Sequence, residues 1–373
     1  MCSKMSYREA VNAMNHFLHR TEEDLVKVRT VSDRMDSIGQ DIQKKLEEET
    51  SCSLGMYGFD KETGVTKPTA ILSENLVNVQ ETDPETACKR EKIMKKAVEK
   101  INSTREEKIP ASYLSFPMEK NPGKCVYISI DDIGVKRQKD TRREDSVRQS
   151  RFVENSVAHI QYEQSVFMLT AIGMKELFKR ILAYLLEKHL FRKELVFFTD
   201  GARNIRKSIE DVFAFHPSIL ILDWYHLKKK CMELLSMSIK GKEERNTVLE
   251  KLLRHLWVGN LEEADAYLHS LSDSKIKSRS RLEELCSYLE RKGDSIPCYA
   301  LRAALGLRNS SNPVEKANDL LVAERQKHNG MSWTPHGSGA LASIQMLFEN
   351  NLAKSWFSEK KRSYSVLTGD FCA

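Results

Sequence analysis

The chain has 373 residues, of which 40% are hydrophobic and 30% are charged, and this composition favours an ordinary globular protein with a sizeable core and two or three domains over a disordered one. Its formal net charge of +6 suits an anionic partner without establishing one. The longest apolar runs, such as ILIL at 219–222, fall far below the roughly 20 residues that a membrane span needs, so we expect a soluble, non-exported protein without membrane contacts.

The cysteines argue against two further classes of protein. They lie at positions 2, 52, 88, 125, 231, 286, 298 and 372, without a Cys-x-x-Cys pair or the spacing of a disulfide framework. A zinc knuckle and a disulfide-stapled secreted domain are therefore not expected, and a reducing cytosol is the simplest compartment.

Residues 1–120 predict a helical, charged N-terminal arm. Mixtures of Glu and Lys such as DIQKKLEEET favour helix, and a loose stretch over 60–82 separates them from the basic helical pattern KREKIMKKAVEKINSTREEK. At NPGKCVYISIDD a turn leads into an alternating run over 125–131 that ends on an aspartate pair. This run is the first predicted strand of the core.

The core continues with alternating strands and helices. Strands are expected at about 134–138, 156–162 and 165–171, and MKELFKRILAYLLEKHL has the spacing of an amphipathic helix. A strand ending on Asp200, a helix over about 202–213, a strand ending on Asp223 and a helix from Trp224 follow. From residue 134 on, the resulting series is βββαβαβα, which is typical of a layered α/β fold with a mixed sheet.

Strand patterns vanish over 240–308, which we expect to be an all-helical insertion. Within it, one helical side gathers apolar residues that should place Trp257 in an apolar cluster: Leu252, Leu253, Leu256 and Leu261. Stacking of Trp257 on a DNA base is the alternative. The predicted domains are thus 1–120, a core in two parts at 121–239 and 309–373, and the insertion at 240–308.

Three carboxylates stand at the ends of predicted strands: Asp131, Asp200 and Asp223. Active sites of open sheets lie at such strand ends. Phosphoryl transfer with two divalent ions needs acidic side chains that converge from different elements, because hard cations such as Mg²⁺ prefer oxygen ligands. The pattern therefore indicates a metal-dependent site.

Five motifs carry a resemblance to a known family. They are YISIDD, FTDGARNI, LDWYHLKK, NPVEKANDLLVAERQKHNGMSW and GSGALASI, in this order. Over roughly 120–355 the chain resembles the Mutator-like and Lre-type bacterial insertion-sequence transposases. These enzymes have a ribonuclease H-like core with an Asp-Asp-Glu (DDE) triad and often a helical insertion that helps to hold DNA ends.

The resemblance implies a function and a site. Asp131, Asp200 and Glu315 would be the catalytic metal ligands for two Mg²⁺ or Mn²⁺ ions, and Asp223 with His226 would form an Asp-x-x-His motif beside them. The protein would be a DDE transposase, an endonuclease that also joins strands in DNA transposition and recombination. It would bind element ends and target DNA as a homodimer or higher oligomer in the bacterial cytoplasm, associated with the nucleoid.

The two aspartates of the proposed triad have competing interpretations. Asp132 could face inward in place of Asp131, because neighbours on a strand point to opposite faces. Asp200 could merely cap the helix that follows it, and Asp223 is the rival second ligand. His226 could hydrogen-bond Asp223 in a structural role only, as a lone histidine on a helix usually does.

Glu315 also has a structural alternative, because Asn-Pro-Val-Glu over 312–315 spells a capping box with Pro at the first helical position. A polar helix face formed by Asn318, Asp319, Arg325 and Lys327 would instead follow a DNA backbone. Basic runs that could contact phosphates, or could be ordinary solvated faces, occur at 136–151, 228–230, 275–281 and 360–362.

Two other functions stay open at this point. A decayed or domesticated transposase copy would be a non-catalytic DNA-binding remnant that keeps the fold. A cellular nuclease of the same fold would use the same acids but would hydrolyse DNA without joining strands.

Overall fold

The computed structural model describes residues 4–21, 25–139, 150–327, 331–358 and 366–367. Its centre is a five-stranded sheet in the order β3-β2-β1-β4-β5, in which the first three strands are antiparallel and the last two run parallel to β1. The strands are β1 (Val126–Lys136), β2 (Phe152–Tyr162), β3 (Ser165–Ile172), β4 (Leu195–Thr199) and β5 (Ser218–Leu222). This is the ribonuclease H-like arrangement, and it confirms the predicted α/β fold class.

The predicted strands at 125–131 and 134–138 are one continuous strand, β1, so the prediction that Asp131 ends a strand was wrong. β1 pairs with β2 along its whole length, from Val126 opposite Tyr162 to Lys136 opposite Phe152. The aspartate pair is tolerated inside the strand because Asp132 accepts a hydrogen bond from the Ser156 hydroxyl on β2. A polar side chain on the neighbouring strand thus allows β1 to continue through two aspartates that in the sequence resemble the start of a turn.

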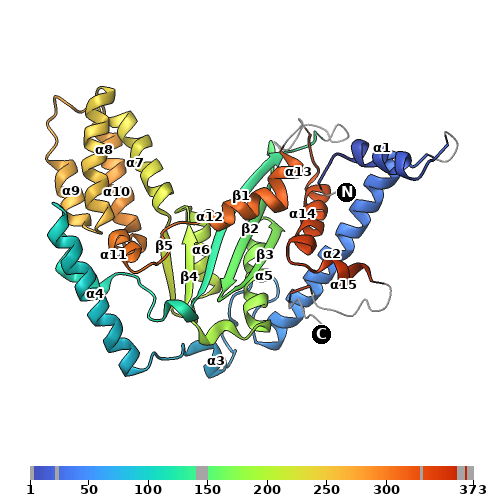
Figure 1. The fold of residues 1–373 in the computed structure, drawn as a ribbon, viewed down its shortest axis with the longest axis horizontal. Coiled ribbons are helices and arrows are strands. Elements are labelled where there is room, and N and C mark those ends of the chain that lie inside the picture. Colours follow the sequence, from blue (N-terminus) through green and yellow to red (C-terminus); the bar gives the residue numbers. More distant parts are fainter. Residues whose placement is uncertain (1–3, 22–24, 140–149, 328–330, 359–365, 368–373) are drawn as a thin grey trace.

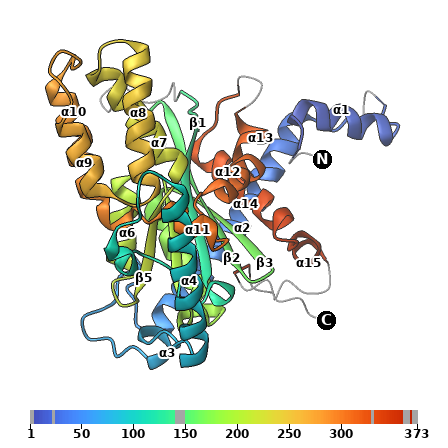
Figure 2. The same cartoon turned by 60° about the vertical axis from the view of Figure 1, so that its left-hand side comes forward.

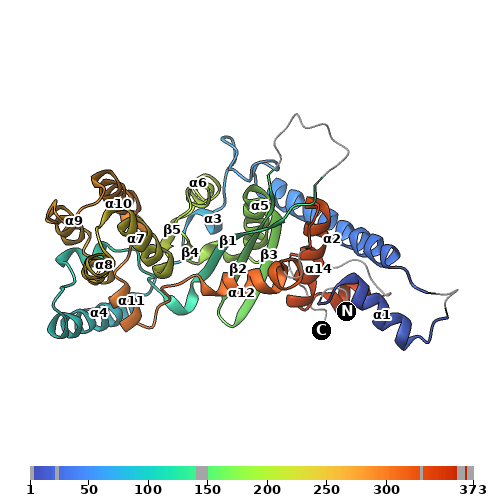
Figure 3. The same cartoon turned by 90° about the horizontal axis from the view of Figure 1, so that it is seen from above.

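Helices cover both faces of the sheet. Figure 3 shows α5 (Met174–Glu187) and α6 (Arg203–Val212) on one face and α12 (Asn312–Asn318) on the other. The apolar positions of α5 are buried almost without exception, and they join the core that β1, β2 and β3 form. α12 contacts β1 and β2, and it continues through a π-helical segment (Asp319–Ala323) into α13 (Glu324–Gln326).

The N-terminal helices pack on two separate parts of the molecule (Figures 1 and 2). α2 (Val28–Met56) lies against α5 and α14 (Pro335–Glu349), whereas α4 (Pro84–Thr104) contacts α11 (Tyr299–Ala304). The contact of α2 with α14 is close, because a Cβ on Gly39 would come within 2.6 Å of Ala340 backbone atoms. Shorter helices are α1 (Tyr7–Phe17), α3 (Glu74–Val77) and α15 (Ala353–Phe357).

The predicted helical insertion is a group of helices with a hydrophobic core of its own. It contains α8 (Lys242–Trp257), α9 (Leu261–His269), α10 (Arg279–Lys292) and α11, and α7 (Trp224–Ser238) shares the same core. Trp257 lies in this cluster with its ring centroid 4.8 Å from that of Trp224. Among the described residues, no helix has the length and apolarity to cross a membrane.

Candidate active site

The strand register places three aspartates at one level of the sheet. Ser129 on β1 is paired with Phe198 on β4, and Thr199 on β4 is paired with Leu222 on β5. Continued beyond these pairs, the same register sets Asp131 opposite Asp200 and Asp200 opposite Asp223. Because neighbouring strands lie about 4.8 Å apart, the sheet brings the three residues into a row at the carboxyl ends of β4 and β5.

Asp131 points toward α12. Its Oδ2 accepts a hydrogen bond from Asn318 Nδ2 at 2.7 Å, and its Oδ1 accepts one from the Asp132 N–H at 2.8 Å. Burial is the main cause that raises the pKa of Asp131 to about 6; the Asp132 N–H opposes this rise and the negative charge of Asp200 contributes to it. The carboxylate therefore lies in a place where a positive charge would stabilise its ionised form.

Asp132 lies on the opposite side of the strand. Beyond its contact with Ser156, its surroundings include Asn204 on α6. Burial raises the pKa of Asp132. The alternation of β1 thus gives the two neighbouring acids different surroundings, with only Asp131 bonded to α12.

Asp200 does not cap α6. The N-cap residue is Ala202, and Asp200 Oδ1 instead accepts the Ala202 N–H at 2.7 Å in a turn that ends β4. Gly201 has φ +85°, and a Cβ there would come within 2.8 Å of Leu222. Only glycine fits this bend comfortably, so the residue after Asp200 lets the chain turn directly from the strand into the loop before α6.

Asp223 is saturated with hydrogen bonds. It caps α7, where its Oδ1 accepts a hydrogen bond from the His226 N–H at 2.9 Å and lies 3.2 Å from His226 Nδ1. Its Oδ2 accepts hydrogen bonds from the Ser311 N–H at 2.5 Å and from the Ser311 hydroxyl at 3.1 Å. The side chain is 1% exposed. Burial alone would raise the pKa of Asp223, but the bonds from His226 and Ser311 outweigh it and lower the pKa.

His226 faces the row of aspartates from the first turn of α7. The hydrogen bond with Asp223 raises the pKa of His226; burial opposes the rise, and the charges of Asp200 and Asp131 reinforce it. A protonated His226 would therefore place a positive charge beside these carboxylates. The structure leaves the Asp-x-x-His pair bonded as the sequence predicts, with Asp223 as the partner that orients the ring.

Glu315 does not form the predicted capping box. The N-cap residue of α12 is Ser311, without a side-chain cap, because the Ser311 hydroxyl and N–H both bond Asp223. Glu315 is exposed, and within the described chain its carboxylate has no hydrogen bond or ion pair. It precedes Asn318 by three residues, so the two side chains lie on neighbouring positions of one helix face.

Asn318 is a site residue for which the sequence predicts another place. It was expected on an outer polar face with Arg325, but Asn318 is 6% exposed and bonds Asp131. Arg325 is also buried, with its guanidinium 5.0 Å from the ring centroid of Tyr7 and 5.3 Å from that of Trp333. The predicted DNA-following face is therefore wrong for these two residues. The sequence does carry one sign of this role: Asn318 is a polar residue one helical turn after Glu315, and so lies on the same side of the predicted helix.

The donor set at the row fits a hard divalent cation. It consists of carboxylate oxygens and the amide oxygen of Asn318, and this buried Oδ1 has no hydrogen-bond partner in the described part of the chain. The carboxylates of the row lie farther from one another than the ligands of a single bound ion do. Among the His, Cys, Asp and Glu side chains of the described residues, a group of three with ligand atoms within 4.8 Å of one another occurs only at Asp265, His269 and Cys286, on the surface of the insertion.

The basic runs differ in whether their side chains form ion pairs with acidic residues. Lys228 and Lys229 are exposed on α7 just after His226, without an ion pair to any described residue, whereas Lys230 lies 3.8 Å from Glu233. In the run at 275–281, ion pairs engage Lys275 with Glu244, Arg279 with Asp273 and Arg281 with Glu284. The run at 360–362 and most of that at 136–151 lie outside the described residues.

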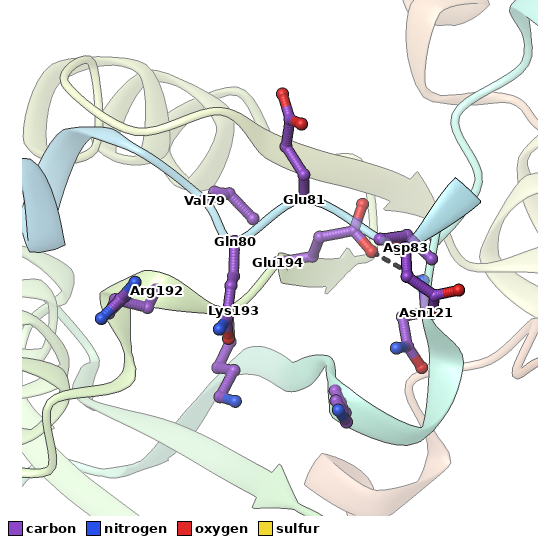
Figure 4. A pocket seen from close by; sticks show the side chains of 10 residues that line it. Val79, Gln80, Glu81, Asp83, Asn121, Arg192, Lys193 and Glu194 are labelled. Atoms are coloured by element: carbon purple, nitrogen blue, oxygen red, sulfur yellow. Dashed lines mark hydrogen bonds between the residues drawn. The ribbon is translucent and has the colours of Figure 1, made fainter. Parts of the chain in front are cut away.

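A small polar pocket of about 190 Å³ lies at the other end of β4 (Figure 4). There the Glu194 carboxylate, immediately before the strand, accepts the N–H groups of Lys120 and Asn121 at 2.7 and 3.0 Å. Asp200 follows the opposite end of the same strand. This pocket is therefore separate from the row of aspartates, and its Glu194 ties the segment before β1 to β4.

Comparisons with known proteins give little more. No protein-family model matches the sequence, and no curated protein does. A solved structure described as the Drosophila P element transposase strand transfer complex is similar at 12% sequence identity, with a TM-score of 0.22, over 73% of this chain and 76% of that one. A likeness of this extent specifies neither fold nor function.

Proposed function

We propose that the protein is a metal-dependent DNA transposase that cuts and joins DNA through Asp131, Asp200 and Glu315. The observation that carries the proposal is the convergence of two neighbouring parallel strands and α12. The register of β1 with β4, continued two residues past the pair Ser129–Phe198, sets Asp131 opposite Asp200, and Asn318 bonds Asp131 one helical turn after Glu315. The five family motifs of the sequence add support, because the two aspartates and the glutamate fall within three of them.

Divalent ions bound at this site, Mg²⁺ or Mn²⁺, would activate the attacking oxygen and stabilise the leaving oxygen of a phosphodiester. The chain contributes the positions of the acids. Asp131 stands on a strand paired with β2 over its whole length, and Asp200 follows β4 through a bend that only glycine fits well. Glu315, without a partner among the described residues, keeps its carboxylate free.

We assign Asp223 and His226 supporting roles. Both carboxylate oxygens of Asp223 already accept hydrogen bonds, so a metal would have to displace donors there, which makes Asp223 the poorer second ligand. Its bonds hold the His226 ring toward Asp200 and fix the start of α12. His226 would then orient the ligands or contact the DNA phosphate next to them.

The substrate we propose is the DNA at the two ends of a Mutator-like or Lre-type insertion sequence, followed by target DNA. Lys228 and Lys229 lie on the exposed side of α7 beyond His226, where a phosphate backbone entering the site would find unpaired positive charge. Because two ends must be joined to one target, we also propose a homodimer or higher oligomer on DNA.

The test is incubation of purified protein with the DNA that flanks its gene and Mg²⁺ or Mn²⁺, scoring nicking and strand joining separately. Asp131→Asn, Asp200→Asn and Glu315→Gln should each lower the rate of cleavage by a factor of about 10³ or more, since each removes a ligand charge and little volume. Asp132→Asn is the matched control on the opposite side of β1 and should retain cleavage. Circular dichroism and DNA affinity should be unchanged in all four variants.

The outcomes separate the alternatives. Nicking without joining would indicate a nuclease, and DNA binding without either reaction would indicate a non-catalytic remnant. An active Asp200→Asn variant together with an inactive, folded Asp223→Asn variant would move the second ligand to β5. Full activity of Glu315→Gln would remove Glu315 from the set of ligands.

A further inference from the structure

We propose that Asn318 supplies a fourth oxygen ligand to the metal site, through its side-chain amide oxygen. The inference rests on the proposed function, since it concerns the same divalent ions. It extends that function by giving α12 two ligands one turn apart, the carboxylate of Glu315 and the amide of Asn318, and by making Asn318 a direct partner of Asp131 at the ion.

The first observation is that Asn318 is only half satisfied. Its Nδ2 donates to Asp131 Oδ2 at 2.7 Å, but its Oδ1 is buried without a hydrogen-bond donor among the described residues. A buried amide oxygen that lacks a donor destabilises the folded protein, and most buried polar atoms in proteins therefore have a hydrogen-bond partner. A residue whose only role was to hold Asp131 would gain by satisfying this oxygen.

The second observation is the spacing of the two side chains. Oxygens on adjacent corners of an octahedral Mg²⁺ site, with bonds of 2.0–2.1 Å, lie about 2.9 Å apart. The Asn318 amide nitrogen is now 2.7 Å from Asp131 Oδ2. A half-turn of the amide about its last side-chain bond exchanges nitrogen and oxygen, and would set two oxygens at the separation that one cation bridges. Without a cation the nitrogen must face the carboxylate, as it does here.

The local backbone holds Asn318 in this place. Asn318 is the last residue of α12, and the π-helical segment Asp319–Ala323 follows it directly. A widened turn of this kind is uncommon and is frequent at functional sites. Val314 and Ala317 bury the same side of α12 against the core, so the helix can shift little when the amide turns.

Two substitutions of Asn318 distinguish a hydrogen-bond donor from a metal ligand. Asn318→Asp removes the N–H that bonds Asp131 but keeps an oxygen in the same place, whereas Asn318→Leu removes both. If Asn318 acts only as a hydrogen-bond donor, both variants lose its function equally. A residue that binds the ion is replaced by aspartate and not by leucine.

The experiment measures Mn²⁺ binding to the full-length protein by the electron paramagnetic resonance signal of free Mn²⁺. Asn318→Leu should weaken binding by about 10-fold or more, as loss of partners at a metal site does, whereas Asn318→Asp should bind at least as tightly as the unsubstituted protein. Mn²⁺ should also raise the Tm of Asn318→Asp more than that of the unsubstituted protein, because it neutralises two adjacent carboxylates.

Asn350→Leu is the matched control for damage to the fold. Asn350 is a buried asparagine that bonds both the N–H and the carbonyl of Met168 at the sheet edge, at 2.9 and 2.8 Å. This variant should lower the Tm without changing Mn²⁺ affinity. If Asn318→Leu does not fold, the comparison of Asn318→Asp with the unsubstituted protein decides the question.

The failures of the two proposals are distinguishable. If the unsubstituted protein binds no Mn²⁺, or binds it equally well after Asp131→Asn, the site itself is refuted and both proposals fall. If Asp131→Asn abolishes binding but Asn318→Asp is as weak as Asn318→Leu, Asn318 is a donor only and the proposed function stands. Unchanged binding by Asn318→Leu would likewise overturn the ligand role alone.

Discussion

His159 lies on β2 directly opposite Ser129, in the row of side chains next to Asp131. Its Nδ1 is buried without a hydrogen-bond partner in the described residues. Burial, together with the positive charge of Arg308, lowers the pKa of His159 to about 4. The folded protein therefore keeps this ring neutral under conditions in which the unfolded chain binds a proton.

We predict an acid-sensitive contribution to stability from this residue. Because the folded pKa is below the unfolded value of 6.5, the free energy of unfolding falls as the pH drops from about 6.5 to about 4, by at most about 3 kcal/mol. His159→Phe should remove this part of the pH dependence in urea unfolding measured across that range. His269→Phe, at an exposed position of α9, should keep it, and an unchanged slope for His159→Phe would contradict the prediction.

At this scale the sequence predicts the acids better than their partners. Asp131, Asp200 and Asp223 each follow an apolar run, so their place in or just after a strand could be expected from the sequence. The capping box at Glu315 could not be rejected, because Ser311 bonds Asp223, a residue 88 positions away in the chain. The same holds for Asn318, whose contact with Asp131 spans 187 positions.

A buried ion pair joins the segment before β1 to α11. Arg302 and Glu119 are both fully buried, and the two guanidinium nitrogens Nη1 and Nη2 each donate to one Glu119 oxygen at 2.7 Å. Arg302 also donates to the carbonyl of Arg308. The pair thus connects the N-terminal segment, the insertion and the chain that leads into α12.

Removing one member of this pair should be costly. We predict that Glu119→Gln lowers the free energy of unfolding by about 3–5 kcal/mol, because it leaves the Arg302 charge buried without a counter-charge. Chemical denaturation measures the change. Glu284→Gln, which removes the exposed partner of Arg281, is the control and should cost less than about 1 kcal/mol. A similar cost for the two substitutions would show that the burial of the pair has no energetic weight.

Elements with strong periodicity were predictable, and irregular ones were not. β3, β4, β5 and α5 lie close to their predicted ranges because their apolar patterns agree with their burial. The unbroken course of β1 depends on the Ser156 hydroxyl of another strand. The π-helical turn after Asn318 depends on packing around the sheet, and the sequence carries no periodic signal for it.

At the scale of the whole molecule, the net charge of +6 is modest, so under the proposed function the placement of free cations would decide how DNA is held. We predict that DNA affinity falls steeply with salt, with a slope of about −0.9 per phosphate contact. Lys228→Glu with Lys229→Glu should flatten that slope by up to about 2. Fluorescence anisotropy of labelled duplex DNA over a salt series measures it.

The control exchanges cations that acids already hold. Lys275→Glu with Arg281→Glu changes the net charge equally, but these side chains form ion pairs with Glu244 and Glu284. The slope should then change little. Equal effects of the two double substitutions would show that overall charge, and not the exposed side of α7, governs the affinity.

The placement of the N-terminal helices was beyond the sequence. Their mixed charges indicate helices, but nothing in the pattern shows that α2 packs on α14 while α4 packs on α11. The partners of α2 and α4 in these contacts lie at least 195 residues away in the chain. Packing between distant segments depends on shape, as at Gly39 and Ala340, and not on periodicity.

The bonds between Asp223 and Ser311 have a consequence for how such a protein can change in evolution. The chain leaves the core at Asp223 and returns at Ser311, and the Trp224 N–H also bonds the Asn309 carbonyl at 3.1 Å. The stretch between them is an insertion, a side branch of the core, whose two ends are joined by these hydrogen bonds. Doubling the length of a closed loop costs only about 0.6 kcal/mol, so this branch can be enlarged, trimmed or exchanged for another group of helices while Glu315 stays at its distance from the sheet.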